Sequence, residues 1–384
     1  INLSLLSAGV ASSGGVGYGT GPSVGGQRPT NNNFMIEGVD NNNRSVTGPQ
    51  TNVSNEAVSE FSLQQNHFSV EFGHSTGGQF NTLLKTGSNE LHGAAYEYFQ
   101  NRSLNAVDES FKRQGITSNP RFDQNRVGGS LGGPAIRNKW FYFGNYEYNP
   151  TGQASTSPGA VFAPTADGIR TLETLAGVSK RNLDLFKQYV PVAAAQSGTQ
   201  TTSVAGRDIP VGILNVVGPS FANTYNMAIT SDYNLSDRDQ IRARYLYNKS
   251  NTINTTNVVL PYFFTPVLFR AHLASLSEFH TFTPTLTNEF RAAYGRRVED
   301  RPVGDYASGG LDVLPNLQFN DLSLIIGPNS NYPQGSRNNT YQLVDNMTWT
   351  KGRHTLKFGY DGRKTNSSNF FVQRVRGEYI YNSF

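Results

Sequence analysis

From about residue 90 onward, this chain is a succession of paired segments in which apolar and polar residues alternate. In residues 240–248, Ile241, Ala243 and Tyr245 fall on one face, whereas Arg242 and Arg244 fall on the other. An alternation with a period of two is typical of a half-buried β-strand. Because only three or four residues join the two segments of each pair, we predict a series of antiparallel hairpins.

The connections between these pairs are long and run over residues 149–222, 250–269 and 298–338. Loops beyond ~15 residues are uncommon in compact soluble domains. Transmembrane β-barrels combine short turns at one end with long loops at the other, and strands of ~10 residues cross the membrane at a tilt. Aromatic residues near the strand ends favour the same architecture because they suit the membrane interface; they are Tyr146, Tyr148, Tyr245, Tyr247, Tyr294 and Trp349.

We therefore predict a mainly β protein in which residues 90–384 supply about ten strands of a larger transmembrane antiparallel barrel, with the long connections as its external loops. The interior face of such a barrel is polar. The charged residues expected on that face are Arg242, Arg244, Glu289, Arg291, Lys357 and Asp361. They are either solvated wall residues or contacts to whatever occupies the lumen.

The composition argues against several other classes of protein. Charged residues make up 16% of the chain, whereas soluble domains have ~25%. The net charge of +4 is scattered, so nucleic acid is not expected as a partner. Cysteine is absent, which favours an exported bacterial protein. No signal peptide opens the chain and its last residues are strand-like, so we interpret it as an internal part of a longer protein.

Residues 1–89 differ in composition, because they are rich in Gly, Ser and Asn and contain only short apolar segments. Residues 31–43 read NNNFMIEGVDNNN, with asparagine triplets on both sides of Phe34–Ile36. Asparagine tolerates left-handed backbone angles and stabilises turns. The pattern predicts a short buried strand between two turns, within a compact and turn-rich module.

Residues 164–196 are the one stretch with a helical pattern. Thr165 or Asp167 would cap a first short helix, and Ser179 would cap a second. The second helix would carry Leu183, Phe186 and Val190 on one side. We expect both helices to lie within an external loop.

No arrangement of catalytic or metal-binding residues stands out. The chain has no G-x-S-x-G elbow, and its carboxylates are scattered. Its six histidines lack H-E-x-x-H or other paired spacing, although His272 and His280 could share a strand face. We therefore predict no catalytic residue, no metal site, no cofactor and no enzymatic activity.

Three stretches resemble the plug-to-barrel junction of TonB-dependent outer-membrane receptors, and are most similar to the Oar-like branch: residues 25–43, 56–101 and 122–147. The most specific piece is the run E-F-G-x-S-x-G-G-x-x-N-x-x-x-K-T-G-S-N-x-x-H-G over residues 71–93. The resemblance implies a barrel with a plugged lumen. Residues 1–89 would be the C-terminal part of the plug, and residues 90–384 the first part of the barrel.

The resemblance also implies a function, namely uptake of an unidentified ligand across the bacterial outer membrane, energised by the proton-motive force. The partners would be outer-membrane lipid and the TonB–ExbB–ExbD complex, which would grip a Ton box upstream of residue 1. Ionic contacts between plug and barrel are expected in this family. By position, the candidates are Arg28, Glu71, Glu97 and Glu147.

Two other functions remain open on the sequence. A passive adhesin or a secretion-linked barrel would use the same outer-membrane fold without energised import, and would lack a Ton box. A soluble β-sandwich binding module would be extracted without detergent. The identity of the ligand is beyond what the sequence indicates.

Overall fold

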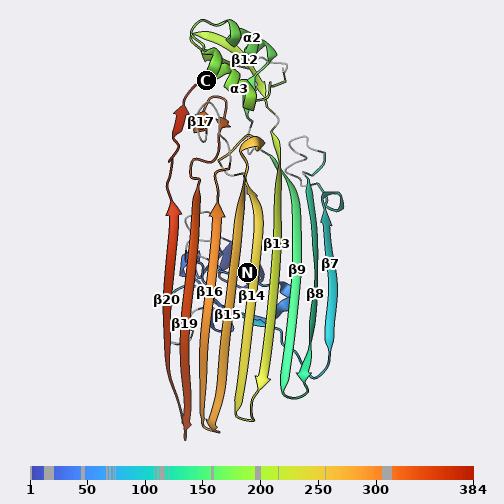
Figure 1. The fold of residues 1–384 in the computed structure, drawn as a ribbon, viewed down its shortest axis with the longest axis vertical. Coiled ribbons are helices and arrows are strands. Elements are labelled where there is room, and N and C mark those ends of the chain that lie inside the picture. Colours follow the sequence, from blue (N-terminus) through green and yellow to red (C-terminus); the bar gives the residue numbers. More distant parts are fainter. Residues whose placement is uncertain are drawn as a thin grey trace.

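The computed structural model describes residues 2–12, 21–44, 48–65, 68, 71, 73, 75–107, 109, 112, 117–119, 121–156, 160–194, 200–214, 216–255, 257–304 and 314–384. Its main element is a nine-stranded antiparallel sheet, called the wall below, whose long strands stand side by side in Figure 1. In spatial order these strands are β7 (His92–Asn101), β8 (Phe122–Ile136), β9 (Trp140–Thr156), β13 (Val217–Asn234), β14 (Asp239–Asn254), β15 (Thr265–Thr283), β16 (Leu286–Arg301), β19 (Gln334–Lys351) and β20 (His354–Phe371). The prediction of a mainly β, partial barrel is confirmed.

The two ends of the wall differ. At one end, called the short-turn end, the hairpins close over residues 137–139, 235–238, 284–285 and 352–353. At the other end, called the long-loop end, the strands continue further than the sequence indicated. The connections expected at 149–222, 250–269 and 298–338 therefore shrink to 157–216, 255–264 and 302–333. In the extensions of β9 and β14, residues 149–156 and 250–254, polar residues occupy both faces, so the alternation that marks a strand is lost there.

Burial on the wall follows the alternation. In β14, Arg244, Leu246 and Asn248 are buried on the inner face, while Ala243 and Tyr245 point the other way. Most of the large apolar side chains that stay exposed on the wall lie on the opposite, outer face. They include Phe99, Val127, Leu131, Tyr146, Ile229, Leu276, Phe290, Leu343, Leu356 and Phe358. This outer face is an apolar surface of the kind that contacts lipid.

A small four-stranded sheet, called the inner sheet, packs against the inner face of the wall (Figure 1). Its order is β4 (Val39–Asp40), β3 (Asn33–Ile36), β6 (Gln79–Leu84) and β5 (Val58–Gln64), with β3 parallel to β6. The predicted buried strand between the asparagine triplets is therefore present as β3. One apolar cluster joins the two sheets; it holds Ile36, Val39, Ala57 and Leu84 from the N-terminal segment and Phe143, Ala228, Leu246 and Leu273 from the wall.

The flanking asparagines hold the β3–β4 hairpin in place. Asn42 accepts a hydrogen bond from the backbone N–H of Phe34 and donates one to Asn33. Between the two strands, Glu37 and Gly38 have φ values of 48° and 76°. Such left-handed angles are disfavoured for most residues and suit a glycine. The turn therefore projects the Glu37 carboxylate out of the hairpin.

The long connections form a folded unit, called the cap, above the wall in Figure 1. It contains β10 (Phe162–Pro164), β11 (Gln200–Val204), β12 (Arg207–Ile213), α2 (Ala166–Thr174), α3 (Lys180–Tyr189), β17 (Asn316–Phe319), β18 (Leu324–Ile326) and β21 (Glu378–Tyr381). The predicted helices are confirmed, since Thr165 caps α2 and Ser179 caps α3. The last strand-like run of the sequence does not join the wall, because β21 pairs with β17 instead.

One hydrophobic core unites the connections that build the cap. It includes Phe186, Tyr189, Leu260, Phe263 and Leu324, which come from three separate loops. On the edge of the cap, Glu378 accepts a hydrogen bond from the Ser330 hydroxyl at 2.6 Å and pairs with Arg374. These contacts stabilise the carboxylate and hold the pKa of Glu378 below its ordinary value.

The remaining elements are short. Strands β1 (Val10–Ser12) and β2 (Pro22–Val24) pair near the inner sheet's apolar edge. Turns of 3₁₀ helix lie at Asn2–Leu6, Pro29–Asn31, Asn55–Ala57, Arg102–Leu104 and Pro261–Phe263. Within the part of the chain that the structure describes, no helix has the length and apolarity required to cross a membrane.

Candidate functional site

The contact between the inner sheet and the wall is centred on Arg244 of β14. Its Nε lies 2.9 Å from the Glu37 carboxylate and its Nη1 lies 2.5 Å from Asp232 of β13. Glu37 also accepts a hydrogen bond from the backbone N–H of Leu84 at 3.2 Å. The Arg244 side chain is 4% exposed. Removing one partner of such a buried pair leaves a charge without compensation and costs ~3–5 kcal/mol.

A second charged network forms around Asp40, at the end of β4, whose side chain is 2% exposed. Arg363 of β20 lies 3.0 Å from Asp40 and 2.6 Å from Asp361. Arg44 approaches Asp40 at 3.1 Å from within the N-terminal segment. The backbone N–H of Asp40 donates to Gln342 of β19 at 2.8 Å. This strand end is therefore tied to two wall strands at once.

Glu147 of β9 links the N-terminal segment to the other side of the wall. It is 3% exposed and accepts a hydrogen bond from the Ser54 hydroxyl at 2.7 Å. Tyr96 and Asn226 each donate to it at 3.2 Å, and Arg126 of the neighbouring strand lies 3.6 Å away. Glu147 thus contacts the N-terminal segment through a hydrogen bond rather than the predicted ion pair, and its ionic partner Arg126 belongs to the wall.

Glu71 makes the fourth contact, an ion pair with Lys357 of β20 at 2.8 Å. The two side chains are 34% and 58% exposed. Exposed pairs contribute only ~0–1 kcal/mol, because water and salt screen them. This contact is therefore much weaker than the networks around Arg244 and Asp40.

A cavity of about 1030 Å³ lies between the inner sheet and strands β13 to β20 of the wall. All six charged residues predicted to face the interior line it: Arg242, Arg244, Glu289, Arg291, Lys357 and Asp361. Glu289 and Arg291 form an ion pair on one strand. The guanidinium of Arg291 also lies so close to Gly38 that a Cβ there would fall 2.3 Å from Nη1. The cavity is thus strongly charged, with both signs interleaved.

Two of the residues predicted as ionic contacts do not serve that purpose. Arg28 is exposed and forms no ion pair with a described residue. Glu97 points to the outer face of β7, since its neighbours Tyr96 and Tyr98 face inward and bond to Glu147 and Glu56. Apolar residues occur at both odd and even positions around Glu97. The sequence pattern therefore does not indicate which face of this strand points inward.

The strongest contacts were missed by sequence reasoning. Glu37 and Asp40, which contribute to the two buried networks, lie outside the alternating wall segments, whereas Arg363 continues the inward-facing series of Lys357 and Asp361 in β20 but was not predicted. A signal for the first two was present. Both carboxylates lie in the short, mainly apolar segment 34–40 between the asparagine triplets, where Arg44 is the nearest cation in the sequence. A buried carboxylate in such a place requires a cation from elsewhere in the chain.

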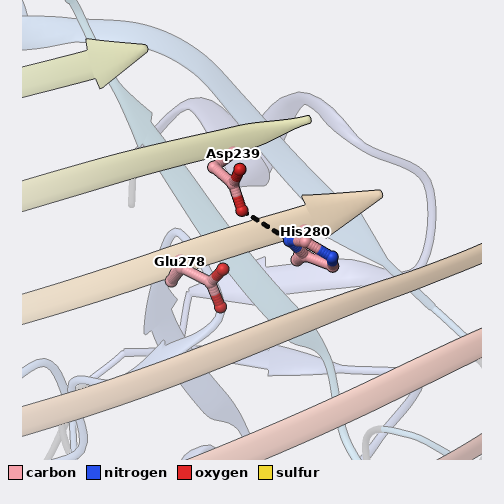
Figure 2. A group of neighbouring side chains, drawn as sticks. All are labelled: Asp239, Glu278 and His280. Carbon is pink, nitrogen blue, oxygen red and sulfur yellow. Dashed lines mark hydrogen bonds and ion pairs between the residues drawn. The ribbon is translucent and has the colours of Figure 1, made fainter. Parts of the chain in front are cut away.

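A separate cluster lies on the outer face of the wall at the short-turn end (Figure 2). Asp239 faces His280 across the β14–β15 pair, with Oδ1 and Nδ1 2.5 Å apart, and Glu278 lies nearby. One ligand atom from each of the three lies within 4.8 Å of the others. Such a set suits Zn²⁺ or a similar cation. The Asp239–His280 contact also holds the neighbouring ends of β14 and β15 together by itself, so the cluster has a structural explanation without a metal.

The fold and the outer apolar face define a class of protein, the outer-membrane β-barrels. Residues 83–384 match the family model described as "Outer membrane beta barrel domain". The chain therefore belongs to this family and is located in the bacterial outer membrane.

Comparison with individual proteins refines this class. The chain is similar to the TonB-dependent transporter Oar of Myxococcus xanthus, with 27% identity over 128 residues, which are 32% of this chain and 12% of the relative. The outer membrane transporter YddB from Escherichia coli is similar in structure (TM-score 0.63, 12% identity, 96% of this chain and 46% of that chain). The siderophore receptor PirA from Acinetobacter baumannii is also similar (TM-score 0.56, 14% identity, 93% and 44%).

These matches confirm the resemblance to TonB-dependent receptors of the Oar-like branch. The chain spans less than half the length of each of these relatives. At such low identities, the two solved structures show a shared fold rather than a shared ligand.

Proposed function

We propose that this chain is part of an energised importer of the outer membrane. Residues 1–89 would be the C-terminal part of its plug, and residues 90–384 the first part of its barrel, with the long-loop end outside the cell. The observation that carries the proposal is the Glu37–Arg244–Asp232 network, which holds the N-terminal segment inside the wall through buried charges. The similarity to a TonB-dependent transporter supports the same proposal.

Buried ion pairs make the N-terminal segment hard to displace thermally. Release would separate Glu37 from Arg244 and Asp40 from Arg363. Taking a partner from a buried charge costs free energy, up to ~3–5 kcal/mol where no other partner remains. Spontaneous release would therefore be rare. A mechanical pull from TonB, driven by the proton-motive force of the inner membrane, would supply the missing free energy.

The interface is also built so that it can reform after release. Most contacts are hydrogen bonds and ion pairs between defined partners, such as Thr230 with the backbone carbonyl of Lys85 at 3.0 Å. The apolar cluster shared by the two sheets is small. The adjoining cavity of about 1030 Å³ offers space into which the segment could shift. A ligand would then pass between the inner sheet and strands β14 to β20.

Thiol labelling in cells tests the proposal. Leu84 is 3% exposed at the interface with the wall, and the chain has no cysteine. The variant Leu84→Cys of the full-length receptor is treated with a membrane-impermeant maleimide in cells growing on complex medium. Labelling above that of the parent receptor is expected in energised cells, and should fall when TonB is deleted or the proton gradient is dissipated.

Equal labelling with and without TonB would refute energised import. It would favour the passive alternative, an adhesin or a secretion-linked barrel. Ser330→Cys in the cap serves as a control, because its labelling should not depend on TonB.

A further inference from the structure

The outer face of the wall carries a group of positive charges that import does not explain. Lys249, Arg270, Arg296 and Arg337, called the cationic patch, come from four neighbouring strands, β14, β15, β16 and β19. Lys249 lies directly opposite Arg270 in register. Arg270 and Arg337 both lie opposite Val298, and Arg296 is two residues from Val298 on the same face. The four side chains therefore share one side of the sheet.

The register places these charges close together. Neighbouring strands are ~4.8 Å apart, so the Cα atoms of Lys249 and Arg337, three strands apart, are separated by about 15 Å. Among the described residues, none of the four forms an ion pair with a carboxylate. Arg296 donates to the Asn339 side chain at 2.9 Å, and Lys249 lies over the Tyr225 ring. Asp300, further along β16, is the acidic residue nearest to the patch on this face in register.

The patch lies at the edge of the apolar surface, toward the long-loop end. Tyr247, Tyr294 and Tyr341 adjoin it on the same face. Beyond these tyrosines, toward the short-turn end, the outer face carries Leu276 and Leu343, whose side chains are 52% and 53% exposed. Tyrosines mark the interface of a membrane, where polar headgroups begin. The cationic patch is thus at the depth of the headgroups, and beside the lipid chains.

We propose that the cationic patch binds the phosphorylated headgroup of an outer-membrane lipid. Arginine binds phosphate oxygens bidentately, and clustered basic residues at a membrane surface attract anionic lipids. Free phosphate would satisfy the charges equally well, but only a lipid also covers the adjoining tyrosines and leucines. This inference rests on the outer-membrane location and is independent of whether the receptor imports a ligand.

Lipid retention by the full-length receptor tests the proposal. The receptor is purified in detergent, reconstituted in phosphatidylcholine nanodiscs and titrated with lipid A, a diphosphorylated glycolipid. The test variant is Lys249→Gln/Arg270→Gln/Arg337→Gln. The matched control removes the same charge from exposed positions of the cap, with Arg170→Gln/Lys180→Gln/Arg207→Gln. Each basic contact is worth a factor of about five, so the test variant should bind on the order of 100-fold more weakly.

The arms of the experiment separate the alternatives. The proposal predicts that the control variant binds lipid A like the parent, that dephosphorylated lipid A binds poorly, and that inorganic phosphate competes weakly. It is overturned if the test variant keeps the parent affinity, if both variants lose affinity equally, or if inorganic phosphate binds as tightly as lipid A. Thermal unfolding of each reconstituted variant checks that the barrel is folded, and labelling at Leu84→Cys reports import separately.

Discussion

Replacing Arg244 with methionine should loosen the inner sheet far more than any exposed substitution. Arg244→Met keeps much of the side-chain volume but leaves the carboxylates of Glu37 and Asp232, which are 18% and 11% exposed, without their cation. The loss of one partner from a buried pair costs ~3–5 kcal/mol. That cost falls on the closed state of the interface, because a released inner sheet exposes Glu37 to water.

Hydrogen exchange of the full-length receptor measures this cost directly. The amides of β3 and β6 exchange when the inner sheet opens, so their exchange rates should rise between about 100-fold and several thousand-fold in Arg244→Met. The amides of central wall strands should change little. Glu71→Gln is the control, because it removes the exposed pair with Lys357, and its effect should stay below about fivefold.

The outcome can refute the reasoning in two ways. An increase below about fivefold in Arg244→Met would show that the buried network does not hold the sheet. Equal effects of Arg244→Met and Glu71→Gln would show that burial does not set the strength of these contacts.

Three further predictions use the same receptor. Asp40→Asn removes the charge that pairs with Arg363 and should destabilise the closed interface by about 3 kcal/mol, seen as faster exchange in β3. Gly38→Ala forces a side chain into a φ of 76° and against Arg291; it should cost about 1–2 kcal/mol in the same assay. Because the folded pKa of Glu378 is lowered, its stabilising contribution is complete above its ordinary pKa and is lost as the pH falls through the folded value. Protection of β21 amides, corrected for intrinsic rates, should therefore weaken below about pH 4.5, and Glu378→Gln should abolish this dependence.

The wall could be predicted from the sequence because its signal is local. The alternation around Arg242 and Arg244 fixes a strand and its inner face within nine residues, and a polar turn fixes its partner. The caps of α2 and α3 are equally local, since Thr165 and Ser179 bond to backbone groups three residues later. The ends of the strands were placed less well, because both faces of the extensions beyond residues 149 and 250 are polar.

The contacts of the inner sheet could not be predicted in the same way. Glu37 meets Arg244 over 207 residues of sequence and Asp40 meets Arg363 over 323, and no local pattern encodes such distant partners. Glu97 shows a related difficulty, which is to decide which of two alternating faces points inward. A shift of one residue along a strand moves a side chain from the lumen face to the lipid face. Position along the chain pointed to Glu147 as an ionic contact, whereas its contact with the N-terminal segment is a hydrogen bond from Ser54 and its ionic partner is Arg126 of the wall.

The shared core of the cap has a consequence for how this surface diversifies. Phe186, Leu260 and Leu324 belong to different connections, yet they pack together, so a change of size in one demands a compensating change in the others. Loops that lack such a core can vary one at a time. Here the cap should be inherited as a block, with variation arising at exposed positions of α2 and α3 rather than from insertions in single loops.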